Sequence, residues 1–191
     1  ISLGLVGSEM CIRDSSIVIP AYNEEETIGP CLESCVAQTV PAYEIIVVNN
    51  KSTDGTESVI REYQKLYPHA PITLVQQDEA QGITPTRNAG FDAARGDIIG
   101  RIDSDSIIEP NWVEETLRAF DDPTVAAATG PVVCYDMPLR RFGKIADSTL
   151  RKAMFELTRD YKFLFGSNMA ISRSAWEQVR DETCADVEDL M

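Results

Sequence analysis

The sequence predicts an α/β fold in which a mostly parallel sheet is flanked by helices. Over the first two thirds of the chain, short apolar runs rich in Ile and Val alternate with amphipathic segments of helical length. This alternation is typical of βαβ units, whose consecutive strands pair in parallel. With 191 residues, of which 43% are hydrophobic and 25% charged, the chain is long enough for one domain with a substantial core.

Four short apolar runs are expected to form the strands of this sheet, at 16–20, 44–48, 72–76 and 97–103. Apolar side chains spaced three and four residues apart predict helices at 24–38, 54–67, 86–94, 111–120 and 144–163. Asp54 followed by Glu57 is typical of a pair that caps the start of a helix. Residues 125–135 are expected to be extended.

The charge balance excludes several classes of partner. Asp and Glu number 31 against 17 Lys and Arg, so the formal net charge is −14. A chain this acidic is a poor binder of nucleic acid. The sequence contains no apolar run of about 18 residues, the length that would predict a membrane-spanning helix. Residues 139–162 differ, with seven basic and three acidic side chains. They favour either peripheral contact with an anionic membrane or, more plainly, a helix with a basic outer face.

The five cysteines are odd in number and form no CxxC pair, which indicates a reduced compartment. We therefore expect a cytoplasmic protein, with the cytoplasmic face of the membrane as the alternative. Cys31 and Cys35 are one helical turn apart in an apolar stripe and are expected to be buried thiols. His69, the one histidine, lies in a Pro-rich turn and is expected to be exposed, so neither a zinc site nor a catalytic triad is supported.

The two ends of the chain differ from the rest. Residues 9–14 resemble a translated transposase-adapter sequence, so we expect 1–15 to be non-native and the native domain to span 16–191. The chain stops just after an acidic cluster. We therefore expect it to be a C-terminally truncated fragment of a longer protein.

Polar segments follow three of the predicted strands, at 21–25, 49–55 and 103–105. Ligands of an open parallel sheet bind beyond the carboxyl ends of its strands, so these segments describe a cleft. No GxGxxG or GxxxxGK[ST] loop is present to hold a diphosphate. Asp103 and Asp105, two residues apart in extended chain, would point the same way and hold Mg²⁺ or Mn²⁺. The alternative, a solvated acidic turn before Pro110, stays open.

Five short motifs appear in order: IPAYNEE (19–25), STDGT (52–56), RNAG (87–90), DSD (103–105) and ED (188–189). With them, the chain resembles a family 2 glycosyltransferase with the Rossmann-like GT-A fold, over 16–191. The resemblance implies a UDP- or GDP-linked sugar donor, a divalent metal and transfer with inversion. It also implies a glycan or lipid-linked acceptor, as in the synthesis of cell-envelope polysaccharide or glycolipid. The nucleotide-binding half would be 16–105 and an incomplete acceptor half 106–191.

By position, the resemblance implies a nucleoside pocket lined by Pro20, Ala21, Tyr22 and Glu24. Asn49 stands where family members usually carry an aspartate that reads the base, and its amide oxygen can still accept a hydrogen bond from a base N–H. The resemblance also implies that Arg87 lies at the diphosphate or nucleoside. Asp103 would contact the ribose or donor sugar and the metal, and Asp105 the metal. Glu188 and Asp189 would take part in catalysis, with Asp189 as general base.

Structural interpretations of the same residues stay open. Asp54 is expected to cap a helix, Asn88 and Gly90 to serve local packing, and Arg87 alternatively to lie on the surface. The functional alternative to an enzyme is a nucleotide-sugar-binding module without turnover, or an inactive fragment. A sugar nucleotidylyltransferase is not supported, because the Gly- and Arg-rich loop expected after the first strand is absent.

Overall fold

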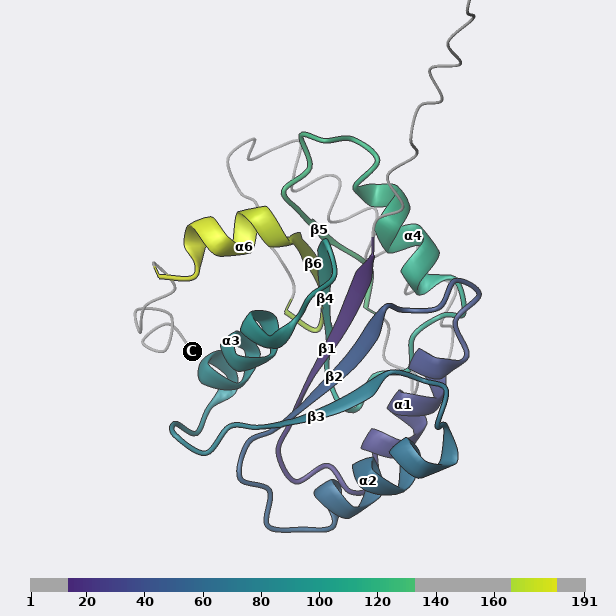
Figure 1. Ribbon diagram of the computed structural model, residues 1–191, viewed down its shortest axis with the longest axis vertical. Helices are drawn as coiled ribbons and strands as arrows, with labels where there is room; N and C mark the ends of the chain where they lie inside the picture. Colours follow the sequence, from purple (N-terminus) through teal and green to yellow (C-terminus); the bar gives the residue numbers. More distant parts are fainter. Residues whose placement is uncertain (1–13, 133–165, 182–191) are drawn as a thin grey trace, which may run out of the picture.

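The computed structural model describes residues 14–132 and 166–181 of the chain. Within these residues a six-stranded sheet has the order β3-β2-β1-β4-β6-β5 (Figure 1). Four strands pair in parallel: β1 (Ser15–Ala21), β2 (Glu44–Asn49), β3 (Ile72–Gln76) and β4 (Ile98–Ile102). Two join antiparallel at one edge: β5 (Ala127–Thr129) and β6 (Asn168–Ser172). The prediction of a mostly parallel α/β fold is confirmed.

Helices cover both faces of the sheet (Figure 1). One face carries α1 (Ile28–Val36), α2 (Thr56–Leu66) and α4 (Trp112–Ala119). The other carries α3 (Ile83–Ala93) and α6 (Arg173–Val179). Side chains of β1 alternate between the two faces, because Ile17 and Ile19 pack with α1 and α2 while Val18 packs with Phe91 of α3. All three β1 side chains are fully buried, so the central strand anchors both halves of the core.

Most predicted elements form within a few residues of their expected bounds, and the differences have local causes. The helix expected from 86 starts at Ile83, because Gly82 adopts φ 137° and its carbonyl accepts a hydrogen bond from the Thr86 amide. The extended segment expected at 125–135 contains a short strand, Ala127–Thr129, within the part that the structure describes. Strand β6 was not predicted as a strand. The helix expected at 144–163 lies outside the described residues, as do 1–13.

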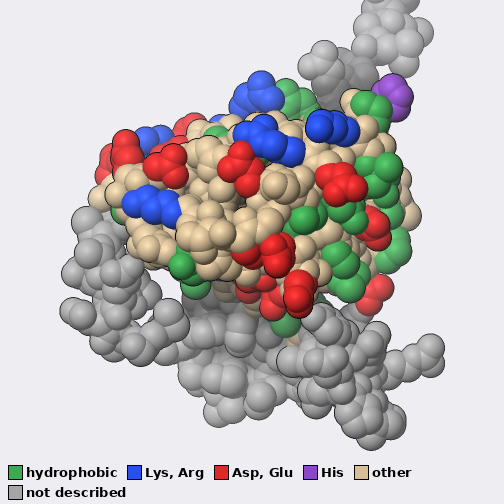
Figure 2. Space-filling view, turned by 90° about the horizontal axis from the view of Figure 1, so that it is seen from below, with side chains coloured by type: hydrophobic (Ala, Val, Ile, Leu, Met, Phe, Trp, Pro, Cys, Tyr) green, Lys and Arg blue, Asp and Glu red, His purple; other side chains and the backbone are tan. Residues whose placement is uncertain are grey.

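The predicted burial of the thiols is confirmed, since Cys31 and Cys35 are 0% and 2% exposed. A hydrogen bond with Cys35, together with burial, raises the pKa of the Cys31 thiol. Sγ of Cys31 lies 3.6 Å from the backbone carbonyl oxygen of Asp103, so helix α1 packs against the carboxyl end of β4. His69 is exposed as predicted, and it is the purple side chain of Figure 2.

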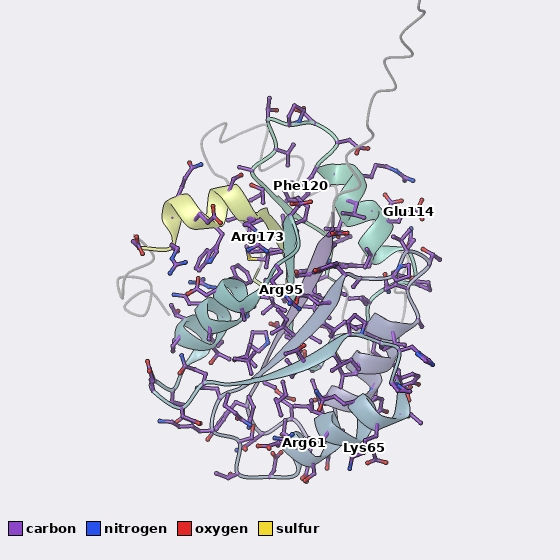
Figure 3. The ribbon with its side chains drawn as sticks, in the orientation of Figure 1. Arg61, Lys65, Arg95, Glu114, Phe120 and Arg173 are labelled. Carbon is purple, nitrogen blue, oxygen red and sulfur yellow. The ribbon has the colours of Figure 1, made fainter. Side chains whose placement is uncertain are left out.

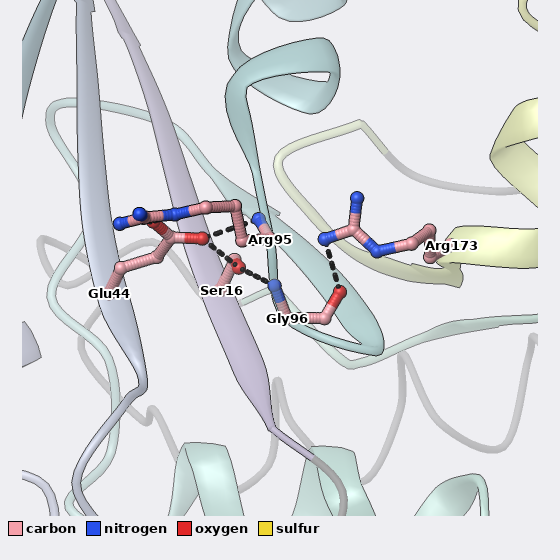
Figure 4. A network of polar contacts seen from close by, with 5 residues as sticks. All are labelled: Ser16, Glu44, Arg95, Gly96 and Arg173. Atoms are coloured by element: carbon pink, nitrogen blue, oxygen red, sulfur yellow. Dashed lines mark hydrogen bonds and ion pairs between the residues drawn. The ribbon is translucent and has the colours of Figure 1, made fainter.

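A polar network ties the amino ends of the strands together (Figure 4). Glu44 of β2, only 3% exposed, accepts hydrogen bonds from the Ser16 hydroxyl at 2.8 Å and from the Arg95 amide at 2.5 Å. Ser16 in turn accepts from the Gly96 amide, and the Arg173 guanidinium donates to the Gly96 carbonyl, both at 2.8 Å. Arg95 and Arg173 lie near each other between α3 and α6 (Figure 3). The network holds the edge opposite the predicted cleft.

No helix among residues 14–132 and 166–181 is long and apolar enough to cross a membrane. Viewed from below, acidic side chains are spread over the described surface, in keeping with the net charge of −14 (Figure 2).

Candidate functional site

The loops that follow β1 and β2 are bound to each other at the carboxyl edge of the sheet. The Asn23 amide donates to Ser52 Oγ at 3.0 Å, and Asn23 Oδ1 accepts from the Thr53 amide at 2.8 Å. The Glu24 amide donates to the Thr56 hydroxyl oxygen at 2.7 Å. Asn23 and Lys51 both adopt left-handed φ values, 55° and 60°, which turn the two loops sharply enough to meet. Two segments that were predicted to share a cleft are therefore one connected unit.

A hollow of about 300 Å³ lies between these loops, lined by Asn23, Glu24, Glu25, Glu26, Thr27 and Asp54. Its shape depends on Asp54, whose carboxylate accepts from the Glu25 amide at 3.2 Å and the Thr56 amide at 3.0 Å. The predicted capping pair is wrong in detail, because the N-cap of α2 is Gly55 and Glu57 instead pairs with Arg61. Asp54 thus stabilises the loop and the start of α2, although it is not the helix cap that was predicted.

The four residues predicted to line a nucleoside pocket lie at this edge with different exposure. Ala21 is buried, Pro20 and Glu24 are half-buried, and Tyr22 is 48% exposed. The Glu24 carboxylate accepts from the Thr27 hydroxyl at 2.5 Å. Among the four, Tyr22 presents the largest open face to a ligand.

Asn49 is buried at the end of β2, with 4% of its surface exposed. Its amide nitrogen donates to Gln76 Oε1 at 2.9 Å, and its oxygen accepts from the Ser52 amide at 3.2 Å. The next residue, Asn50, donates to the carbonyls of Gln77 and Ala80 and accepts from the Gly82 amide, each at 2.8 Å. Asn50 therefore fixes the segment between β3 and α3, a role that the sequence did not reveal.

Arg87 lies inside α3 and not at its start, since the helix begins four residues earlier. Its guanidinium donates to Asn88 Oδ1 at 3.1 and 2.8 Å, and no carboxylate pairs with it among the described residues. Desolvation, and then the charge of Arg101, lower the pKa of Arg87. The half-buried Arg87 is therefore not a plain surface residue. Gly90, one turn on, serves packing as predicted, because a Cβ there would collide with Val18 and Val48.

The Asp103–Asp105 segment is a turn, which corrects the prediction that it continues the strand. Strand β4 ends at Ile102, and the Ser106 amide donates to the Asp103 carbonyl at 3.0 Å. Ser104 is consequently buried and Asp105 exposed, while Asp103 keeps 39% of its side chain exposed. The two carboxylates share the cleft edge through the turn and not through strand alternation.

Arg101, which the sequence analysis did not single out, contacts one of the two aspartates. Its Nη2 lies 3.0 Å from Asp103 Oδ1, and its side chain is 9% exposed. Across the sheet edge, Gly166 leaves room for it, because a Cβ at Gly166 would lie 2.6 Å from Arg101 Nη1. Asn168 of β6 accepts from Trp112 Nε1 at 2.9 Å and so joins β6 to α4. Glu188 and Asp189 lie outside the described residues.

The donor atoms at this edge suit a hard cation in part. Asp103 and Asp105 offer carboxylate oxygens, which Mg²⁺ and Mn²⁺ prefer. Within the described parts of the chain, no three His, Cys, Asp or Glu side chains gather in a way that could hold a metal. A cation held here would therefore take the rest of its ligands from a bound molecule or water, which fits a site shared with a phosphorylated ligand.

This fold and this arrangement of loops define the class of protein. The chain belongs to glycosyl transferase family 2, whose model matches residues 16–180, and its sheet and helices form the GT-A fold. It is 34% identical over 119 residues to the glycosyltransferase AglE of Haloferax volcanii, covering 61% of this chain and 38% of AglE.

Two solved structures share the fold. One is the mannosyltransferase PcManGT from Pyrobaculum calidifontis in complex with GDP-Man and Mn²⁺ (TM-score 0.70, 23% identity), covering 87% of this chain and 46% of that one. The other is glucosyl-3-phosphoglycerate synthase from Mycobacterium tuberculosis with Mn²⁺, UDP and glucosyl-3-phosphoglycerate (TM-score 0.60, 24% identity), covering 85% and 57%. The chain spans about two fifths of the length of curated relatives such as AglE.

Proposed function

We propose that this chain binds a UDP- or GDP-linked sugar with a divalent metal and transfers the sugar, with inversion, to a hydroxyl of a glycan or lipid-linked acceptor. The observation that carries the proposal is the joining of two polar segments, 21–25 and 49–55, at the carboxyl edge of a family 2 domain, the edge at which the 103–105 turn follows the parallel strand β4. Relatives of the same fold are described with GDP-Man, UDP and Mn²⁺, which supports this class of donor and cofactor.

The nucleoside would lie over the first two loops. Tyr22 offers an exposed ring for contact with the base, and Pro20, Ala21 and Glu24 would line the pocket beside it. Asn49 could bind the base only with its side-chain amide nitrogen and oxygen, which already form hydrogen bonds with Gln76 and Ser52. Arg87, half-buried and without a carboxylate partner among the described residues, would meet the negative charge of a diphosphate.

Asp105 and Asp103 would hold the metal, and Asp103 would also meet the ribose or donor sugar. When bound, the divalent ion supplies positive charge that stabilises the departing diphosphate. Arg87 would add to that stabilisation from α3. Both carboxylates stand at the turn after β4, and because β4 pairs in parallel with β1, this turn lies at the same edge of the sheet as the loop after β1.

Inversion requires a single displacement. The acceptor oxygen attacks the anomeric carbon from the side opposite the diphosphate, the bond from that carbon to the phosphate oxygen breaks, and the hydroxyl proton passes to a carboxylate. Asp189, beside Glu188, is proposed as that base. A cytoplasmic location, with 139–162 in contact with a membrane surface as the alternative, belongs to the same proposal.

Calorimetry with UDP and GDP, in Mn²⁺ or in EDTA, tests the proposal. We expect one of the two nucleotides to bind in Mn²⁺ and binding to weaken strongly in EDTA, with ADP as the control for base selectivity. Equal affinity in EDTA would contradict the metal role, and the absence of binding by both nucleotides would contradict the donor class.

A binding module without turnover is the second candidate, favoured by the amide of Asn49, whose hydrogen bonds are already made within the protein. Release of free UDP or GDP from the corresponding sugar nucleotides separates the two. Nucleotide binding without release, in the presence of a panel of sugar acceptors, would favour the module.

A further inference from the structure

Arg101 is a charged residue in a strand whose other side chains are apolar. It stands between Ile99 and Ile102, both fully buried, and is itself 8% exposed. Alternation along β4 turns Arg101 toward the face of the sheet that carries α3, the same face as Ile99. A guanidinium therefore occupies a position where the pattern of the strand calls for an aliphatic side chain.

The contacts of Arg101 do not offset the cost of burying it. Nη2 meets Asp103 Oδ1 at 3.0 Å, but that carboxylate is 39% exposed. Nε is buried and has no hydrogen-bond partner among the residues that the structure describes. Burying a charge costs free energy unless it is both paired and fully hydrogen-bonded, and replacing such a pair by apolar side chains is often neutral or stabilising. Stability alone does not explain an arginine here.

The surroundings of Arg101 carry an excess of positive charge. Arg87 approaches from α3, closely enough for the charge of Arg101 to lower its pKa. Asp103 is the one carboxylate that pairs with either guanidinium within the described residues. Two guanidinium groups thus act on each other here, and of the two only Arg101 pairs with a carboxylate among the described residues, in a chain whose net charge is −14.

We propose that Arg101 is a positioning residue that gives the two aspartates of the turn different tasks. By binding Oδ1 of Asp103, it fixes that carboxylate, with its other oxygen free for the donor, and neutralises part of its charge. Asp105, exposed and not paired with Arg101, is left as the principal carboxylate for the metal. Being buried, Arg101 acts through Asp103 and does not itself touch the donor. This inference rests on the proposed function.

The proposal makes two effects of Arg101→Met run in opposite directions. Mn²⁺ alone should bind about threefold more tightly, because a nearby positive charge is removed and Asp103 is freed to act as a ligand. UDP or GDP at saturating Mn²⁺ should bind about tenfold more weakly, because Asp103 is no longer held. A purely structural role would weaken both.

The experiment compares wild type, Arg101→Met, Arg101→Lys and Arg118→Met by calorimetry and by urea unfolding of the metal-free protein. Arg118→Met removes an exposed arginine from α4, whose neighbour Leu117 packs near the start of β4, and it should match wild type in both binding measurements. Arg101→Lys, which keeps the charge and loses the planar fork, should bind Mn²⁺ as wild type does and bind nucleotide with intermediate affinity. Arg101→Met should be at least as stable as wild type.

Combination with Asp103→Asn tests whether Arg101 acts through Asp103. Adding Arg101→Met to Asp103→Asn should cost little further nucleotide affinity, whereas independent roles would make the two losses add. Strong destabilisation or failure to fold in Arg101→Met would overturn the proposal in favour of a structural arginine. Unchanged nucleotide affinity in Arg101→Met would overturn it while the proposed function stands. A wild-type chain that binds neither nucleotide would contradict the proposed function and this inference together.

Discussion

The side-chain amide nitrogen of Asn49 donates a hydrogen bond of 2.9 Å to Oε1 of Gln76 on the neighbouring strand. Gln76 continues this series of hydrogen bonds in the same direction, because its own amide nitrogen donates to the Glu57 carboxylate at 2.9 Å. The chain of donors therefore runs from Asn49 through Gln76 to Glu57, with a negative charge at its end. An aspartate at position 49, the usual residue of the family, would reverse the first bond of this chain.

We expect Asn49→Asp to lower the free energy of unfolding by about 1–3 kcal/mol at pH 7. The new carboxylate would face Gln76 Oε1, and rotation of the Gln76 amide would then turn its oxygen toward Glu57. Urea unfolding gives the measurement. Adding Glu57→Gln supplies the missing donor and should restore most of the loss. A double variant as unstable as Asn49→Asp alone would contradict this account.

The fold was predictable because the spacing of apolar residues along the sequence indicates which side chains are buried. Strands such as β3, expected and found at 72–76, are bounded by turn residues and carry apolar side chains, of which Ile72 is buried and Leu74 and Val75 are half-buried. Strand β6 was missed, because Asn168 and Ser172 at its ends make it look polar and its partner β4 is more than 60 residues away in sequence. Pairing between distant segments leaves no local pattern.

The parts of the site formed by short polar segments after the strands were predictable. The parts that depend on contacts between distant segments were not. The polar loops after β1 and β2 were expected at one edge and are bound together there. The turn at Asp103 was expected only as the alternative to extended chain, because a strand end and a turn look alike in a short polar run. Arg101 was missed, because only the folded chain shows that a charge between two apolar residues is buried.

Two aspartate variants separate metal binding from proton transfer. Asp105→Asn should weaken Mn²⁺-dependent nucleotide binding by at least tenfold, since it removes one carboxylate charge from the proposed metal site. Asp189→Asn should leave that binding near wild type, since Asp189 is proposed to act on the acceptor. Calorimetry with UDP and GDP in Mn²⁺ checks both. Loss of nucleotide binding in Asp189→Asn with retention in Asp105→Asn would exchange the two roles.

Acid should destabilise the loops through Asp54. Partial desolvation raises the pKa of Asp54, but hydrogen bonds from the Thr56 hydroxyl and amide and from the Glu25 amide outweigh it, and the net pKa is lowered. A carboxyl whose pKa is lower in the folded state stabilises the protein above its unfolded pKa and loses that contribution as pH falls through the folded value. The loss should therefore appear below about pH 4. Asp54→Asn should unfold with a shallower pH dependence between pH 2 and 5, and an unchanged slope would contradict this.

In the polar network at the amino ends of the strands, the contribution of buried hydrogen bonds can be separated from that of an ion pair. Glu44 is 4% exposed as a side chain, while its partner Arg95 is 71% exposed. Removing the arginine side chain returns a largely solvated group to water, whereas removing the carboxylate leaves the Ser16 hydroxyl and the Arg95 amide without an acceptor.

We therefore expect Glu44→Ala to cost about 2–4 kcal/mol of unfolding free energy and Arg95→Ala about 1 kcal/mol or less. Glu44→Gln should fall between them, because its amide oxygen can still accept from Ser16 while its NH₂ group faces the Arg95 guanidinium. Urea unfolding at about 0.1 M and about 1 M NaCl, where the Debye length is about 10 Å and about 3 Å respectively, measures all three. Salt should leave the cost of Glu44→Ala nearly unchanged, because neutral donors carry most of it. If Arg95→Ala costs as much as Glu44→Ala, and both costs shrink in salt, then the ion pair and not the buried hydrogen bonds holds the amino ends of β1 and β2 together.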